Sequence, residues 1–298
     1  MKFKFKRNQV SGIILYLKYL IFGFITKKNT KLFVRGSDCI STGPLLGVEH
    51  ELFFSEFLRY CSKNNGDFLL DIGANIGLIS CQVGDNFDQL DVVEPNPIVQ
   101  NILKSNLLIS FDKSKYKLHE FGLGAKDDRL MMKIPKHNFA GAFIKEGNPY
   151  DEKLLATKDG FKKIDESNYI TTSVNIKNAT DFFTDIFKLY VDNNKLNGVI
   201  KIDVEGFEMI ILEAIKKTLP SELNLVICFE NLNIDFGLAD YLSNFDRDLE
   251  VYELTSGRFE NTASSIRNRI NRLLFGWVYS LDPVDSNNIV GDLVIHIK

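Results

Sequence analysis

The sequence predicts a doubly wound α/β fold, in which a mostly parallel sheet is covered by helices on both faces. Three observations lead to this prediction. Short, continuously apolar segments such as residues 68–70 are typical of buried parallel strands. Segments with apolar residues at helical spacing alternate with them along the chain. Glycine-containing or acidic turns follow several apolar segments directly, at the sheet edge where this fold class binds ligands.

The expected elements follow one another in a regular order. Strands are expected at residues 68–71, 90–94, 116–121, 172–176, 198–203, 223–230, 249–254 and 292–297. Helices are expected at residues 51–61, 78–83, 97–110, 179–190, 206–218 and 238–244. The rhythm breaks between them: residues 122–134 resemble a loop and a strand, and residues 136–169 are polar without a clear period. We interpret residues 136–169 as an insertion.

Composition and charge indicate one globular domain with a basic head. The 298 residues are 45% hydrophobic and 25% charged, which suits a domain at residues 48–298 and an N-terminal extension at residues 1–47. Residues 1–37 carry nine basic and no acidic residues. Because the whole chain has a net charge of −3, the remaining residues must carry a net charge of −12. This asymmetry favours an anionic partner for the head and argues against nucleic-acid binding by the whole domain. The four cysteines form no CxxC pair and are interpreted as reduced thiols of a cytosolic protein.

Within the head, residues 13–25 form an apolar stretch with lysines on both sides. It is shorter than the roughly 20 residues that span a bilayer, and it lacks the cleavage site of a signal peptide. Two interpretations stay open. The stretch is either a buried helix of an N-terminal helical extension, or an interfacial helix whose basic neighbours in residues 1–31 contact anionic headgroups. The second would place a cytoplasmic protein at the inner face of the membrane.

The first candidate site motif is DIGANIG at residues 71–77, between an expected strand and helix. Glycine at positions 73 and 77 would let the backbone approach a ligand closely. The spacing is GxxxG, so the GxGxxG fingerprint of dinucleotide binding is missing. Asp71 could accept a hydrogen bond, directly or through water, from the ammonium group of an amino-acid-like ligand. The alternative is a plain strand–helix turn with glycines for tight packing.

The second motif is VEPNP at residues 93–97. Glu94 ends the next strand about 20 residues after the glycine loop, where an acidic side chain can bind both ribose hydroxyls of an adenosine. Pro95 and Pro97 restrict the loop that follows. The alternative is that Glu94 is simply an exposed carboxylate at a strand end. The occurrence of this motif at the expected distance after the first motif argues against that alternative.

The third motif is KIDVEGFE at residues 201–208, where three carboxylates and a lysine surround the end of a core strand. Glu205 and Glu208 gain from the dipole of the following helix. Lys201, in an apolar strand, needs an acid or a ligand as its partner. Carboxylates this close together suit a general base, and they could equally hold a divalent cation at Asp203 and Glu205.

Together with GLGAKDD at residues 122–128, these motifs resemble the FkbM-type family of S-adenosylmethionine-dependent methyltransferases over about residues 48–252. The resemblance implies a Rossmann-like, seven-stranded class I methyltransferase fold. It also implies S-adenosylmethionine as cofactor and O-methylation of a hydroxyl on a small-molecule, sugar, glycan or natural-product acceptor. Carried over by position, the residues at the methionine end of the cofactor would be Asp71, Gly73, Asn75 and Gly77, those at the ribose Glu94, Pro95 and Asn96, and those facing the transfer site Asp203, Glu205 and Glu208.

The chain departs from the simplest family members at the basic head, at residues 136–169 and at residues 256–288. We expect these segments to shape the acceptor site or to tether the enzyme. The last one carries basic and aromatic residues that form either a solvated helix or a clamp for a phosphate-bearing acceptor or lipid-linked glycan. These residues are Arg258, Arg267, Arg269, Arg272, Phe275 and Trp277.

The expected reaction is direct displacement, in which an acceptor oxygen attacks the cofactor methyl group and a carboxylate removes the proton. A divalent cation is the alternative to that base. The catalytic candidates are Asp203, Glu205, Lys201 and Glu230, with His50 as an alternative base. An NAD-dependent enzyme and a non-catalytic membrane-associated scaffold of the same fold are the rival functions. The missing GxGxxG argues against the first, and the intact acids Asp71, Glu94 and Asp203 argue against the second.

Overall fold

The computed structural model describes residues 17, 20–21, 32–35, 42–45, 49–158, 160–231, 238–243, 245–258, 277–284 and 291–298. Most of the apolar stretch at residues 13–25 lies outside these ranges, and so do residues 259–276 of the late basic segment. The interpretations of both therefore stay predictions. No helix in the described ranges is long and apolar enough to cross a membrane.

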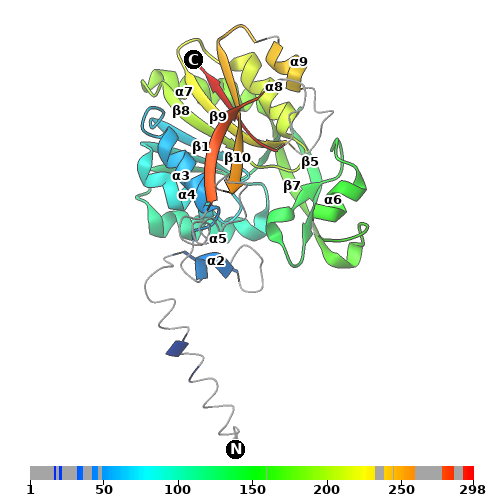
Figure 1. The fold of residues 1–298 in the computed structure, drawn as a ribbon. Coiled ribbons are helices and arrows are strands. Elements are labelled where there is room, and N and C mark those ends of the chain that lie inside the picture. The colour runs from blue at the N-terminus through cyan, green and yellow to red at the C-terminus, as the bar shows by residue number, and fades with distance from the viewer. Residues whose placement is uncertain are drawn as a thin grey trace, which may run out of the picture.

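An eight-stranded sheet forms the centre of the molecule (Figure 1). Its strand order is β11-β10-β12-β9-β8-β1-β2-β3; the five strands from β9 to β3 are parallel, and the other three pair antiparallel. The strands are β1 (Phe68–Ile72), β2 (Gln89–Val93), β3 (Tyr116–His119), β8 (Asn197–Ile202), β9 (Asn224–Asn231), β10 (Leu249–Arg258), β11 (Trp277–Pro283) and β12 (Gly291–Ile297). The α/β class is confirmed, with eight strands instead of the seven that the resemblance implied. The additional strand, β11, comes from residues 256–288 and lies at the sheet edge.

Helices cover both faces of this sheet (Figure 1). Alternation of side chains along β1 explains how one strand serves two cores. Phe68 and Leu70 pack in the cluster that contains α7 and α8, whereas Leu69 packs in the cluster that contains α3, α4 and α5. The helices are α2 (Thr42–Leu45), α3 (Leu52–Cys61), α4 (Leu78–Val83), α5 (Pro97–Ser110), α6 (Glu152–Lys158), α7 (Ala179–Asp192), α8 (Glu208–Thr218) and α9 (Leu238–Ser243).

A second, four-stranded sheet stands beside the main one and contains the expected strand at residues 172–176 (Figure 1). Its order is β4-β7-β5-β6, with β4 (Gly122–Gly124), β5 (Asp128–Pro135), β6 (Phe143–Ile144) and β7 (Tyr169–Asn178). The segment predicted as an insertion lies between β5 and β7. It contains β6, α6 and two short turns of 3-10 helix, η3 (Phe139–Gly141) and η4 (Glu166–Asn168).

Candidate active site

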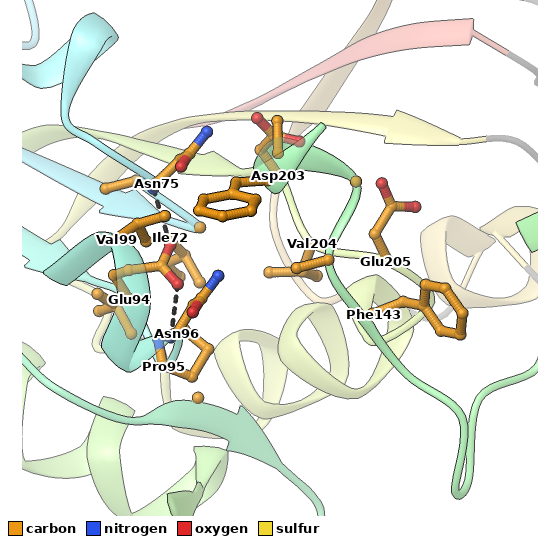
Figure 2. Close-up of a pocket in the computed structure, with 18 of the residues that line it drawn as sticks. Ile72, Asn75, Glu94, Pro95, Asn96, Val99, Phe143, Asp203, Val204 and Glu205 are labelled. Atoms are coloured by element: carbon orange, nitrogen blue, oxygen red, sulfur yellow. Dashed lines mark hydrogen bonds between the residues drawn. The ribbon is translucent and has the colours of Figure 1, made fainter. Parts of the chain in front are cut away.

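A pocket with a volume of about 280 Å³ opens at the carboxyl ends of β1, β2 and β8. Its walls are formed by the loops after β1 and β2, the loop after β8, the second sheet with η3 and β6, and the residues just before α3. In Figure 2, Glu94, Pro95 and Asn96 lie on one side and Val204 and Glu205 lie on the opposite side. The structure therefore brings the three sequence motifs together at the predicted edge of the sheet.

The two glycines of the first motif are explained by the protein's own packing. Gly73 and Gly77 have φ angles of 82° and 81°, which residues with a Cβ atom rarely adopt. A Cβ on Gly73 would lie 1.8 Å from the carbonyl oxygen of Asp203, and one on Gly77 would lie 2.6 Å from Leu103. Gly73 lines the pocket, whereas Gly77 is the N-cap of α4 and is not among the lining residues. Tight packing, the alternative considered for this motif, thus accounts for both positions.

Lys201 forms a buried ion network at the bottom of the pocket. Its Nζ lies 3.1 Å from Asp71 Oδ1 and 3.1 Å from Asp203 Oδ2. Burial opposes its charge, but the carboxylates of Asp203 and Asp71 outweigh burial and raise the pKa of Lys201 above its usual range. Lys201 therefore stays an ammonium ion and supplies positive charge, not a base.

Asp71 lies behind this lysine and not on the pocket wall. It is 1% exposed, and its second oxygen, Oδ2, accepts a hydrogen bond from Ser80 Oγ at 2.5 Å. The contact predicted between Asp71 and a ligand's ammonium group, directly or through water, therefore stays a prediction for a residue that does not line the pocket. Asp71 acts on the pocket through Lys201.

Glu94 lines the pocket and is held in place by the backbone. Its two carboxylate oxygens accept hydrogen bonds from the N–H groups of Asn75 and Asn96, both at 2.7 Å (Figure 2). Burial raises the pKa of Glu94 to about 7, although these two hydrogen bonds favour the ionised form. Each oxygen keeps acceptor capacity for a ligand's hydroxyl group.

Two buried amide atoms beside Glu94 lack partners within the described part of the chain: Asn75 Oδ1 and Asn96 Nδ2. The orientation of the Asn96 amide is set by its role as N-cap of α5, because Oδ1 accepts the N–H of Ile98 at 3.0 Å. Asn96 is 1% exposed, so its Nδ2 donor has no access to bulk water. A buried donor without a partner costs about 1–3 kcal/mol, which a bound acceptor would recover.

Carboxylates collect on the opposite side of the pocket and along the sheet edge. Asp203 and Glu205 line the pocket, whereas Glu230 does not. Glu230 pairs in register with Asp292 of β12, which belongs to none of the sequence motifs. Burial, followed by the nearby charge of Glu230, raises the pKa of Asp292 to about 6. Among the residues that the structure describes, no three His, Cys, Asp or Glu side chains form a metal-binding group.

Glu208, which the resemblance placed at the transfer site, has a structural role in the start of α8. Its side chain is buried and does not line the pocket. Glu208 Oε1 accepts the N–H of Gly206 at 3.1 Å, at the start of α8. This is the helix-terminus role that its position in the sequence also allowed.

A latch from the insertion holds the loop after β8. Asn148 Nδ2 donates to the carbonyl oxygens of Glu205, at 2.6 Å, and Ile144, at 2.8 Å, and Asn148 Oδ1 accepts the N–H of Tyr150 at 2.9 Å. Gly206 has a φ angle of 90°, and a Cβ there would lie 2.1 Å from Asn148 Oδ1. The insertion therefore fixes the acidic motif in place, which its polar sequence did not indicate.

Replacing Asn148 by Ala should loosen this latch. Three hydrogen bonds are lost, so we expect a loss of about 2 kcal/mol in the free energy of unfolding. Hydrogen exchange at residues 203–206 should become faster. Urea denaturation and exchange mass spectrometry measure both, with the exposed Asn64→Ala as the matched control. Unchanged exchange at residues 203–206 in Asn148→Ala would show that the latch does not hold the loop.

Comparison with known proteins shows which family the chain matches. The family described as "Methyltransferase FkbM domain" matches residues 71–255. "Methyltransferase 1" of Beauveria bassiana is 23% identical over 56% of this chain and 66% of its own length, just under two thirds. "Methyltransferase sdnD" of Sordaria araneosa is 24% identical over 60% of this chain and 74% of its own length. A solved O-methyltransferase from Bacillus cereus is 10% identical, with a TM-score of 0.37 over 98% of this chain and 92% of that one.

Proposed function

The chain belongs to the family of methyltransferases with an FkbM domain, and on that premise we propose that it transfers the methyl group of S-adenosylmethionine to a hydroxyl oxygen of a small-molecule or glycan acceptor. One observation carries the proposal most strongly. One pocket is lined both by Glu94, with the unpartnered amide atoms of Asn75 and Asn96, and by Asp203.

The cofactor side of the pocket fits S-adenosylmethionine by its chemistry. Glu94 would accept hydrogen bonds from the two ribose hydroxyls, and Asn96 Nδ2 would donate to a nitrogen of the adenine ring. Pro95 adds an apolar wall beside that ring, and the Lys201 ammonium would pair with the carboxylate of the methionine end. When bound, this cofactor supplies a methyl group on a positively charged sulfur, which is a strong electrophile.

The opposite side suits an acceptor that combines apolar surface with a hydroxyl group. Phe139, Phe143 and Val204 line it, and such faces pack against a sugar ring or a natural-product skeleton. Asp203 orients the acceptor hydroxyl, and Glu205 stands beside it in the same loop. A divalent cation held by Asp203 and Glu205 is the alternative means of activating that hydroxyl.

The direct test is methyl transfer to the natural acceptor. A cell extract from a strain that lacks the gene is incubated with the purified chain and S-adenosylmethionine that carries a tritiated methyl group. We expect tritium in an organic-soluble or glycan fraction, and mass spectrometry should show a gain of one methyl group on oxygen. Transfer to nucleic acid or to a carbon or nitrogen atom would contradict the proposed acceptor class.

We further propose that residues 48–298 form the catalytic domain of a cytoplasmic protein and that the basic head places it at an anionic membrane. The end of the head rests on the domain: Phe33 N–H donates to Asn106 Oδ1 at 2.6 Å, and the Arg35 guanidinium lies 3.5 Å from the centre of the Phe139 ring. The basic residues before this contact would be available to lipid headgroups.

Deleting residues 1–28 should change location without changing chemistry, because the contacts of Phe33 and Arg35 are retained. We expect the full chain to co-sediment with phosphatidylglycerol vesicles at low salt and the shortened chain to stay in solution. Affinity for S-adenosylmethionine should be the same in both. Phosphatidylcholine vesicles serve as the control. A full chain that ignores anionic vesicles at low salt would refute the membrane role, and a shortened chain that fails to fold would favour the buried helix.

A further inference from the structure

His50 lines the proposed transfer site from a part of the chain outside the three motifs. It precedes α3, and together with Glu51 it faces the same pocket as Lys201 and Asp203. Its Nε2 lies 3.5 Å from Glu51 Oε1. A titratable ring therefore stands on the acidic side of the pocket.

The backbone of His50 is clamped by a side-chain amide from α4. Gln82 Oε1 accepts the His50 N–H at 2.8 Å, and Gln82 Nε2 donates to the His50 carbonyl oxygen at 2.8 Å. Gln82 Nε2 also donates to Ser55 Oγ at 2.9 Å, and Ser55 is fully buried. Two hydrogen bonds to one residue's backbone restrict its position more than an ordinary loop contact does. A residue on a surface loop is thereby fixed over the pocket.

A salt bridge reinforces the same loop from outside. The Arg59 guanidinium donates to both carboxylate oxygens of Glu49, at 3.0 and 3.1 Å, and to the carbonyl oxygen of Gln82 at 3.0 Å. Bidentate pairs of this kind have a defined geometry. The loop that carries His50 is therefore held from both sides.

The charges around His50 favour the neutral ring before reaction and tolerate the protonated ring after it. Burial and the positive charge of Lys201 lower the pKa of His50, and the carboxylate of Asp203 partly opposes them. A neutral imidazole can take a proton at pH 7, whereas Lys201 is already protonated and Asp203 is ion-paired with it. The nearby Glu51 and Asp203 carboxylates would stabilise the imidazolium that forms.

We propose that His50 is the catalytic residue that takes the proton of the acceptor hydroxyl, with Gln82 as the residue that positions it; this rests on the proposed function. The acceptor oxygen forms a bond to the methyl carbon as the bond from that carbon to sulfur breaks, and the electron pair stays on sulfur. The hydroxyl proton moves to Nδ1 of His50, because Nε2 faces Glu51, and then leaves to water. Asp203 holds the hydroxyl in line during this step.

The test compares His50→Gln with His296→Gln, whose imidazole lies on β12 near Glu250 and outside the pocket. Tritium transfer to the extract acceptor is measured from pH 5 to pH 9, and S-adenosylmethionine binding is measured by calorimetry. We expect kcat to fall about 100- to 10,000-fold in His50→Gln and to stay unchanged in His296→Gln. Cofactor affinity should change in neither variant.

A second readout does not depend on the variant. NMR of ¹³C-labelled histidine follows the titration of His50 in the wild-type chain, both with and without S-adenosylmethionine. The acidic limb of the kcat profile should coincide with that titration, below pH 6.5. Gln82→Leu should lower the plateau of kcat and keep the limb, as expected for loss of positioning.

The outcomes separate the two proposals. A chain that neither binds S-adenosylmethionine nor transfers its methyl group would refute the proposed function itself. A chain that binds and transfers, but keeps full turnover and the same acidic limb in His50→Gln, would refute only the role of His50. If His50→Gln does not fold, the wild-type chain still tests the proposal. An acidic limb of its kcat profile that does not coincide with the titration of His50 would also refute the role of His50.

Discussion

Replacing Asp203 by Asn is expected to lower turnover about 100- to 1,000-fold, as for the loss of one preorganised electrostatic contact, while leaving S-adenosylmethionine binding nearly normal. The change preserves the shape of the side chain and removes its negative charge. That charge orients the acceptor hydroxyl and stabilises the protonated His50 that forms during transfer. Lys201 keeps Asp71 as its partner at 3.1 Å, so the pocket should stay intact. Tritium transfer measures kcat, and calorimetry measures binding of the cofactor.

The control for this variant is Asp112→Asn, at an exposed position after α5. Treatment of the wild-type chain with EDTA then separates the two possible roles of Asp203. Loss of activity that Mg²⁺ restores would favour a bound cation, and indifference to EDTA would favour direct contact with the hydroxyl. Full turnover by Asp203→Asn on the natural acceptor would refute both roles and direct attention to Glu205.

The Glu94→Ala variant should bind S-adenosylmethionine more weakly by roughly 1–3 kcal/mol, which is about 5- to 150-fold in Kd. The reason is the loss of an acceptor pair that the backbone N–H groups of Asn75 and Asn96 hold toward the pocket. Because the pKa of Glu94 is raised to about 7, the wild-type affinity should also fall as the pH is lowered from 8 to 6. In this range the carboxyl group takes up a proton and loses acceptor capacity.

Calorimetry at pH 8 and pH 6 measures both effects. Glu120→Ala is the matched control, because Glu120 is an exposed carboxylate whose partner is Lys104. We expect the control to behave as wild type and Glu94→Ala to lose most of the pH dependence. A folded Glu94→Ala variant with wild-type affinity at pH 8 would show that Glu94 does not contact the ribose.

The sequence predicted the site best where local chemistry determines structure. The strands that end at Ile72, Val93 and Ile202 are mostly apolar because both of their faces are covered, and the loops that follow them line the pocket. Asn96 is the N-cap of α5 and is followed by a proline, a combination that predicts the start of a helix. The same residue lines the pocket, so the helix start also predicts a site residue.

Other features depend on partners that lie far away in the chain. Asp91 reads as an ordinary charge in a strand, yet it is fully buried and its Oδ atoms lie 2.8 Å from His119 Nε2 and 2.9 Å from the Tyr190 hydroxyl. Strand β5 pairs with β7, with the insertion between them, so periodicity alone could not show a second sheet. Asp71 was expected to line the cofactor end of the pocket. In the structure Lys201 lies between the pocket and Asp71 and forms an ion pair with it, which the sequence alone does not show.

The identity of the bound cofactor is the point on which the whole account depends. Titration calorimetry of the full chain with S-adenosylmethionine and, separately, with NAD⁺ tests it most directly. We predict saturable binding of S-adenosylmethionine at one site per chain and no heat of binding with NAD⁺. Saturable binding of NAD⁺ without binding of S-adenosylmethionine would contradict the assignment of this pocket to methyl transfer.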